Sequence, residues 1–130
     1  MIAGTGVDII EVSRVKKALD DWGEKFLNRV FTKRELKYAR SKKFSHENLA
    51  ARFACKESVL KAFGDTKIGA QLRNIEIINN EKGKPEVILH GEVKEFADKH
   101  KLYKIEVSMS HTSNYAVSNA ILWKDLEDDK

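Results

Sequence analysis

The chain of 130 residues contains a single cysteine and a single proline. One cysteine, Cys55, cannot form an internal disulfide, so a disulfide-stapled secreted domain is excluded and we expect the protein in the cytoplasm. The N-terminus also lacks the basic and then apolar run of a secretory signal. Charged residues recur throughout the chain, so no stretch approaches the roughly 18 apolar residues of a membrane-spanning helix.

No Pro-, Gly- or Ser-rich stretch divides the sequence. We therefore expect one domain over residues 1–130, with a frayed acidic tail over residues 124–130. A chain of this length buries a smaller fraction of its surface than a longer one does, which makes a shared oligomeric core a natural supplement.

Several catalytic motifs are missing as well. The sequence has no G-x-x-x-x-G-K-S/T or G-x-G-x-x-G phosphate loop, no Cys/His zinc pattern and no G-x-S-x-G nucleophile elbow. These absences argue against ATP hydrolysis, dinucleotide redox chemistry, zinc catalysis and serine hydrolysis.

Positive charge is concentrated in one part of the chain. The formal net charge is +4, but residues 14–44 carry eleven Lys and Arg against four Asp and Glu, so this stretch holds +7 and the rest holds −3. Nucleic acid, anionic lipid or an acidic protein would each satisfy such a basic surface. A solvated, lysine-rich helix face without a partner is the bland alternative.

The first residues have the pattern of a buried strand. Residues 2–10 are apolar and β-branched, and their two glycines allow another backbone or a ligand to come close. Asp8 interrupts this strand, and a carboxylate in an apolar strand is costly to bury without a compensating partner. A structural aspartate with satisfied hydrogen bonds remains the alternative.

Two helices are indicated in the basic stretch. The first has Ser13 as its expected N-cap and Gly23 as its expected break, and the second begins with a capping box made by Thr32 and Glu35. The longest uninterrupted stretch of helix-forming residues then runs over residues 49–63. The rest of the chain predicts a hairpin of strands 75–78 and 86–89, a short helix 92–101, and antiparallel strands 104–110 and 115–123 joined by the turn 111–114.

We place the chemistry on helix 49–63. Helical spacing of three or four residues makes Glu57 a neighbour of Lys61, and Arg52 a neighbour of Lys56, so a carboxylate lies among three cations. An ordinary Glu–Lys helix pair is the simpler interpretation. If Asp8 meets Glu57 in space, however, the two carboxylates could hold Mg²⁺, which completes its octahedron with substrate phosphates and water.

The tripeptide Ser110-His111-Thr112 is a second candidate, because its hydroxyls and imidazole could bind a phosphate or take a proton. A lone histidine in a turn is more often structural. Adjacent Ser and His also point to opposite faces of a strand, which disfavours a Ser/His/Asp hydrolase.

Four sequence blocks together resemble the signature of the holo-acyl-carrier-protein synthase family of 4'-phosphopantetheinyl transferases. Their order and spacing cover about residues 4–122, nearly the whole chain. The blocks are Gly6-Val7-Asp8-Ile9-Ile10-Glu11-Val12, Arg52-Phe53-Ala54-Cys55-Lys56-Glu57-Ser58 with Lys61-Ala62, Gly83-Lys84-Pro85, and Ser108-Met109-Ser110-His111-Thr112 with Tyr115-Ala116.

The resemblance implies an α+β fold, in which a mostly antiparallel sheet packs around a long helix, and a homotrimer with active sites at the subunit boundaries. It implies that Asp8 and Glu57 bind Mg²⁺ and that Lys61 neutralises a pyrophosphate, which makes these three the expected catalytic residues. It also implies a coenzyme A site to which the neighbouring subunit contributes. Besides Lys61, the residues carried over to that site are Arg52, Lys56, Gly64, Gly83, Lys84, Pro85, Ser110, His111 and Thr112.

The activity implied is transfer of 4'-phosphopantetheine from coenzyme A to a serine of an acidic apo-acyl-carrier protein in fatty acid biosynthesis. The serine proton would pass to Glu57 or to a water that Glu57 positions. The basic helix would dock the carrier through Arg14, Lys17, Lys25 and Arg29. The stretch 64–69 departs from the Gly-Thr-Gly start typical of this family.

Two other functions compete with this one. A small nucleic-acid-binding protein would fit the basic stretch, but no recognisable binding module is present and the aromatics fall mostly at helix-core spacing. A related transferase could instead modify a carrier domain of a larger synthase. The short chain favours the stand-alone carrier protein, since the longer relatives contain two fused copies of this unit. We expect neither nucleic acid nor a membrane as a partner.

Overall fold

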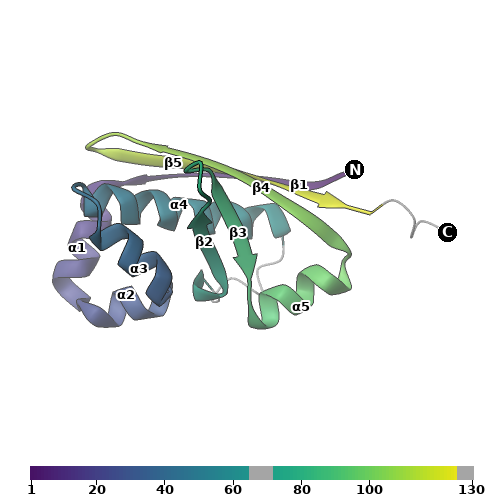
Figure 1. The fold of residues 1–130 in the computed structure, drawn as a ribbon, viewed down its shortest axis with the longest axis horizontal. Helices are drawn as coiled ribbons and strands as arrows, with labels where there is room; N and C mark the ends of the chain where they lie inside the picture. Colours follow the sequence, from purple (N-terminus) through teal and green to yellow (C-terminus); the bar gives the residue numbers. More distant parts are fainter. Residues whose placement is uncertain (65–71, 126–130) are drawn as a thin grey trace.

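The computed structural model describes residues 1–64 and 72–125. Helices and strands are mixed along the chain, as the predicted α+β class requires (Figure 1). In chain order they are β1 (Ile2–Glu11), α1 (Val12–Trp22), α2 (Glu24–Val30), α3 (Lys33–Arg40), α4 (Ser45–Phe63), the 3-10 helix η2 (Leu72–Asn74), β2 (Ile75–Asn79), β3 (Pro85–Leu89), α5 (Gly91–Lys99), β4 (Leu102–His111) and β5 (Tyr115–Lys124).

The strands form two antiparallel sheets. The larger sheet has the order β1-β5-β4, and the hairpin of β2 and β3 forms the smaller one. The long helix α4 runs along one face of the larger sheet and also contacts β2, while α1, α2 and α3 gather at one end of the molecule (Figure 1). This arrangement confirms the predicted antiparallel sheet packed around a long helix.

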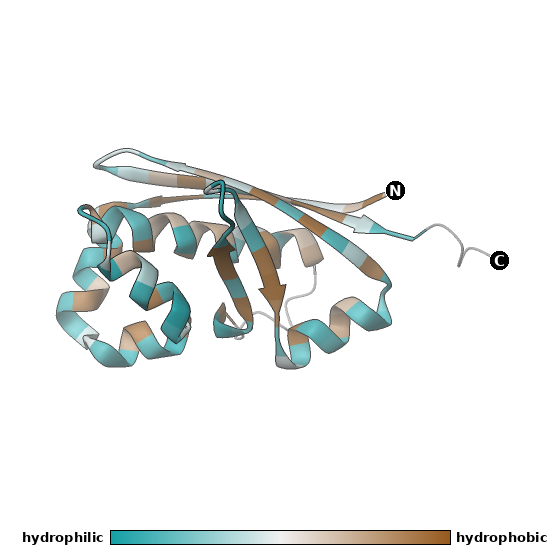
Figure 2. Cartoon of the chain, viewed as in Figure 1, coloured by the Kyte–Doolittle hydropathy of each residue, from teal (hydrophilic) through white to brown (hydrophobic). Residues whose placement is uncertain are grey.

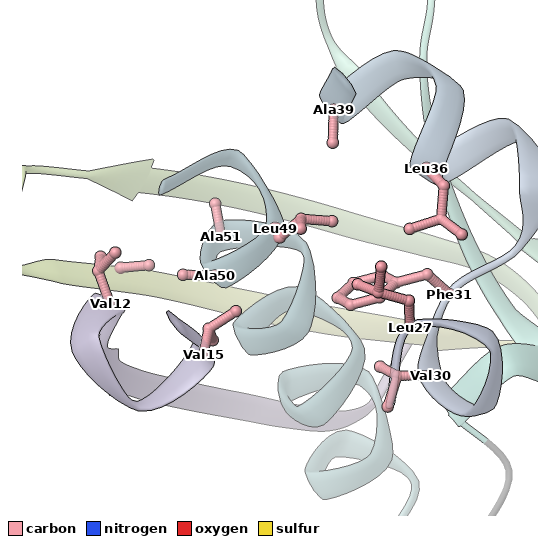
Figure 3. Packing of buried hydrophobic residues seen from close by; sticks show 11 residues of the cluster. Val12, Val15, Leu27, Val30, Phe31, Leu36, Ala39, Leu49, Ala50 and Ala51 are labelled. Carbon is pink, nitrogen blue, oxygen red and sulfur yellow. The ribbon is translucent and has the colours of Figure 1, made fainter. Parts of the chain in front are cut away.

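Hydrophobic residues pack on both sides of α4. One cluster joins α4 to α1, α2 and α3, with Phe31 and Leu49 among its buried side chains (Figure 3). The other joins α4 to both sheets, with Val59 and Ile77 among its buried side chains. Figure 2 shows the apolar colour of β2 and β3 against largely hydrophilic outer sides of α1, α2 and α3. The core therefore surrounds α4 and fixes its position.

Two glycines bring β1 onto the backbone of α4. A Cβ placed on Gly4 would lie 2.1 Å from the carbonyl oxygen of Ala62, and one on Gly6 would lie 2.0 Å from that of Ser58. These separations are far below van der Waals contact, so only glycine fits. The prediction that these glycines allow the close approach of another backbone is confirmed.

Helix boundaries follow local chemistry with two corrections. The N-cap of α1 is Glu11 rather than Ser13, because the first helical residue, Val12, donates its N–H to the Asn114 oxygen at 2.8 Å in place of a side-chain cap. Helix α4 begins at Ser45, four residues before the predicted start, and ends as predicted at Gly64, whose φ is 71°.

The remaining local signals mostly agree with the sequence. Gly23 separates α1 from α2, and Thr32 and Glu35 form the predicted capping box of α3. The predicted start of the frayed tail, residue 124, is too early. Lys124 belongs to β5, and its N–H donates to the Met1 oxygen at 2.9 Å. Residues 126–130 lie outside the described part of the chain. Within that part, no helix combines the length and apolarity needed to cross a bilayer.

A carboxylate on β2 ties several elements together. Glu76 accepts hydrogen bonds from Thr32, from Arg34 at 2.5 and 3.2 Å, and from His90 at 3.0 Å. Burial by itself raises the pKa of the Glu76 carboxyl, but the hydrogen bonds from Arg34, Thr32 and His90 outweigh burial and lower that pKa to about 2.

The close approach at Gly6 predicts a large cost for a single methyl group. Gly6→Ala should lower the free energy of unfolding by roughly 1–3 kcal/mol, because β1 must move away from α4 to accept the new Cβ. Denaturant unfolding measures this change. Thr5→Ala, at an exposed position on the opposite face of β1, is the matched control. Equal stability of the two variants would contradict the close approach.

The depressed pKa of Glu76 predicts an acid-dependent contribution to stability. The group ionises near pH 4.3 in the unfolded chain and near 2 in the folded one, so its contribution is present above about pH 5 and lost as the pH falls through 2. Glu76→Gln should therefore lower the free energy of unfolding at neutral pH by on the order of 3 kcal/mol. This difference should shrink towards pH 2, whereas the exposed Glu86→Gln should show no such trend.

Candidate active site

Asp8 reaches the surface of α4 because of the glycines that precede it. Gly4, Gly6 and Asp8 share the inward-facing side of β1, and beyond the two glycines the aspartate is the next side chain in line with α4. Its Oδ1 lies 2.9 Å from Nζ of Lys61, which also donates to the Val7 oxygen at 3.1 Å. The Asp8 side chain is 17% exposed and that of Lys61 is 53% exposed, so a ligand can reach both.

Glu57 lies one helical turn before Lys61 on the same helix. Burial raises the pKa of the Glu57 carboxyl, the charge of Asp8 raises it further, and the ammonium of Lys61 lowers it. Two carboxylates are thus close enough to repel each other, with one cation beside them. The convergence predicted from the sequence, a strand aspartate meeting a helix glutamate, is present in the fold.

A pocket of about 290 Å³ opens between these carboxylates and the basic helix α1. Its walls are mostly apolar, with two carboxylates and one guanidinium as the charged groups. The residues that line it are Asp8, Ile9, Ile10, Arg14, Val15, Ala18, Phe26, Phe53 and Glu57. The pocket combines charged groups for a phosphate and its counter-ion with a surface for an apolar chain.

Arg52 is buried beneath the turn that joins β2 to β3. Its guanidinium donates to the side-chain oxygens of Asn48 and Asn79, and the Asn79 amide donates to the Gly83 oxygen at 2.9 Å. Arg52 is only 2% exposed, and its Nε has no hydrogen-bond partner among residues 1–64 and 72–125. Arg52 is thus almost fully buried next to the predicted coenzyme-site turn 83–85, whereas Lys84 in that turn is exposed.

Lys56 was predicted to contribute to the coenzyme A site, but its ammonium is fully buried. Its Nζ donates to Glu35 at 2.7 Å, to the Ile75 oxygen at 2.6 Å and to the Leu72 oxygen at 3.1 Å. With 0% exposure the side chain cannot contact coenzyme A. Adjacent helix residues point in different directions, so Lys56 holds α3 and β2 against α4 while Glu57 faces the pocket.

The predicted cluster of three cations around Glu57 is therefore reduced to one. Lys61 acts on the carboxylate, whereas Arg52 and Lys56 are hydrogen-bonded elsewhere in the fold.

Burial raises the pKa of the Cys55 thiol to about 11. A buried thiol of this kind is not a nucleophile at neutral pH.

His111 ends β4 and lies apart from the carboxylate pair. Its Nδ1 is 3.0 Å from Oε1 of Glu47, in the first turn of α4. The Thr112 hydroxyl accepts the N–H groups of Asn114 and Tyr115 at 3.2 and 3.1 Å and so shapes the following turn. Ser110 is exposed on the outer side of the sheet.

The four residues predicted to dock a carrier protein are all exposed on α1 and α2. Arg14 lines the pocket with Asp8 and Glu57. Lys17 forms an exposed pair with Asp21 at 2.7 Å, while Lys25 and Arg29 lie on α2. Only Arg14 is placed beside the candidate chemistry.

Comparison with known proteins agrees with this geometry. A model of the 4'-phosphopantetheinyl transferase superfamily matches residues 4–120, from β1 into β5. The chain belongs to this superfamily. The transferase is similar to the holo-[acyl-carrier-protein] synthase of Thermodesulfovibrio yellowstonii, with 48% identity over 94% of this chain and 99% of the relative.

Solved structures give the same result for the fold. The holo-[acyl-carrier-protein] synthase of Neisseria meningitidis has a TM-score of 0.87 and 28% identity, covering 95% of this chain and all 100% of that one. The synthase from Bacillus anthracis, solved in complex with CoA (3',5'-ADP), has a TM-score of 0.77 and 32% identity, covering 96% and 99% of the two chains. The transferase is therefore an enzyme of the holo-[acyl-carrier-protein] synthase group.

Sequence reasoning missed the partners that hold the transferase's site residues. Glu47, the partner of His111, lies two residues before the predicted start of the long helix, and its contact with the end of β4 depends on the tertiary fold. Asn48 stands four residues before Arg52, a helical spacing that could have revealed it, but the contact of Arg52 with Asn79 depends on the tertiary fold. Gly64 is exposed at the end of α4, and the atypical stretch after it, residues 65–69, lies outside the described residues.

Proposed function

We propose that this enzyme transfers 4'-phosphopantetheine from coenzyme A to a serine of apo-acyl-carrier protein and releases adenosine 3',5'-bisphosphate. The observation that carries the proposal is the meeting of Asp8 and Glu57 in a largely apolar pocket, with the ammonium of Lys61 hydrogen-bonded to Asp8. The names of its relatives support the same reaction, and one of those relatives was solved with CoA (3',5'-ADP).

The chain's residues fit the magnesium ion that such a reaction uses. Asp8 and Glu57 present hard oxygen ligands from two rigid elements. Burial raises the pKa of the Glu57 carboxyl, and repulsion by the Asp8 carboxylate raises it further. The ammonium of Lys61 is the cation that donates a hydrogen bond to Asp8 in the fold. Mg²⁺ held by Asp8 and Glu57 would supply positive charge next to the pyrophosphate.

The side chains have separable tasks in the transfer. The serine oxygen of the carrier forms a bond to the phosphorus that bears the pantetheine arm, and the bond from that phosphorus to the bridging oxygen breaks. Lys61 leaves Asp8 and stabilises the negative charge that the departing bisphosphate acquires. Glu57, or a water that it orients, accepts the serine proton, since a base must lie within hydrogen-bond reach of that hydroxyl.

We propose that the enzyme is a homotrimer whose sites lie between subunits. The outer face of the larger sheet exposes an apolar group, in which Val7 is 62%, Ile9 66% and Val117 39% accessible. Ile9 and Val117 are paired across β1 and β5. Exposed apolar patches of this kind mark association surfaces. The turn 83–85 and residues 110–112 would then complete the carboxylate site of a neighbouring copy.

The acidic carrier protein would approach along α1 and α2. Their exposed cations, Arg14, Lys17, Lys25 and Arg29, favour an anionic partner by long-range attraction, and Arg14 extends this surface to the pocket. The stand-alone carrier of fatty acid biosynthesis is the proposed substrate. A buried, free cysteine is compatible with the reducing cytoplasm, where we place the enzyme.

Intact-mass measurement of apo-acyl-carrier protein after incubation with the enzyme, coenzyme A and Mg²⁺ tests the reaction. We expect one phosphopantetheine adduct, and we expect Asp8→Asn, Glu57→Gln or EDTA to abolish it. Asp98→Asn removes a carboxylate from an exposed Lys–Asp pair on α5 and should leave turnover unchanged. Absence of an adduct with the wild-type enzyme, when a second synthase modifies the same carrier, would refute the proposed function.

Mass determination by light scattering tests the trimer. Val117→Lys, on the central strand, places a charge in the exposed apolar group and should convert the trimer to monomer. Trp22→Lys changes an equally apolar but separate side chain, 67% exposed on α1, and should leave the mass unchanged. A wild-type protein that is monomeric at micromolar concentration would contradict the proposal.

A further inference from the structure

Glu47 is an acidic residue beside the proposed coenzyme site to which neither the family resemblance nor the mechanism gives a task. It occupies the first turn of α4, and its Oε1 lies 3.0 Å from Nδ1 of His111. The Glu47 side chain is only 18% exposed, whereas that of His111 is 36% exposed. A partly exposed imidazole is therefore held by a mostly buried carboxylate.

The chemistry of this pair fixes the state of the imidazole ring. An ionised carboxylate only accepts hydrogen bonds, so Nδ1 of His111 carries a proton directed at Glu47. The hydrogen bond at one ring nitrogen determines which tautomer is present. Nε2 is therefore the ring nitrogen left for a ligand, and the carboxylate restricts rotation of the ring about its side-chain bonds.

The carboxylate that holds the ring belongs to the wall of a groove of binding size. Glu47 lines a groove of about 650 Å³, together with Lys16, Lys43 and Asn114. The Asn114 oxygen accepts the N–H of Val12 at 2.8 Å, so the turn that follows His111 is tied to the start of α1. His111 itself is held by Glu47 of α4, and the turn that follows it is held by α1.

We infer that Glu47 is a positioning residue for coenzyme A, which acts by holding the orientation and tautomer with which His111 meets the coenzyme. This inference rests on the proposed function, because it takes His111 as a contact of the coenzyme. Glu47 acts through His111 and does not touch the reacting atoms. Its removal therefore affects coenzyme binding more than the rate of the chemical step.

An acidic residue in the first turn of a helix can also act by structure alone, because it complements the helix dipole. The two roles differ in their dependence on His111. A stabilising effect on α4 persists when the imidazole is removed, whereas a positioning effect disappears. A double-mutant cycle separates them.

The experiment compares Glu47→Leu and Glu47→Gln, each with His111 intact and in a His111→Ala background. Leucine removes the acceptor, whereas glutamine retains a carbonyl oxygen that can accept from Nδ1. With His111 intact, we expect Glu47→Leu to raise the KM for coenzyme A about tenfold and to change kcat less than about twofold. We expect Glu47→Gln to restore most of the affinity. In the His111→Ala background, Glu47→Leu should have no further effect.

Long-range ¹H–¹⁵N spectra of ¹⁵N-histidine-labelled protein give a readout without turnover. We expect the His111 resonances to report a proton fixed on Nδ1 in the wild type and in Glu47→Gln, and exchange between tautomers in Glu47→Leu. An equal loss of coenzyme affinity with and without His111, or an unchanged His111 spectrum in Glu47→Leu, would overturn the inference. Failure of the proposed function would appear differently, as a wild-type protein that does not bind coenzyme A.

Discussion

The direct contact between β1 and the backbone of α4 is the constraint on which the rest of the structure depends. Gly4 and Gly6 lie against carbonyl oxygens of the helix at distances that no Cβ allows. The next inward residue of β1 is Asp8, so its carboxylate arrives beside Glu57 and Lys61 without any flexible loop. Both carboxylates are carried by elements anchored in the core, which is the arrangement that holds a reactive geometry most firmly.

Charged residues on and around α4 divide between structure and chemistry according to the face they occupy. Lys56 and Glu35 form a buried pair whose remaining hydrogen bonds are satisfied by backbone groups. Breaking such a pair leaves an uncompensated buried charge, which is far more costly than losing an exposed pair. Glu57 lines the pocket instead, and the exposed Lys61 pairs with Asp8. One helix can therefore fix α3 and β2 on one side and present the carboxylate and the ammonium of the proposed site on another.

Local patterns in the sequence predicted the elements well, because they depend on short-range chemistry. The capping box at Thr32, the break at Gly23 and the stop at Gly64 all occur where expected. The meeting of Asp8 with Glu57 was also predictable, from the cost of burying a strand carboxylate and from the family resemblance. The burial of Lys56 was not predictable. Helical spacing gives the neighbours of a residue along its own helix, but it does not tell which other element covers that face, which here is α3 with Glu35. The start of α1 was missed for a similar reason, since the turn before β5 supplies its cap.

The claim that a strand aspartate and a helix glutamate grip one divalent ion is tested most directly by crystallography with Mn²⁺ and adenosine 3',5'-bisphosphate. We predict an anomalous peak at the mouth of the pocket, bonded to carboxylate oxygens of both Asp8 and Glu57, with Lys61 released from Asp8 towards the phosphate. A bound nucleotide with Lys61 still on Asp8, and a metal peak elsewhere or none, would contradict it.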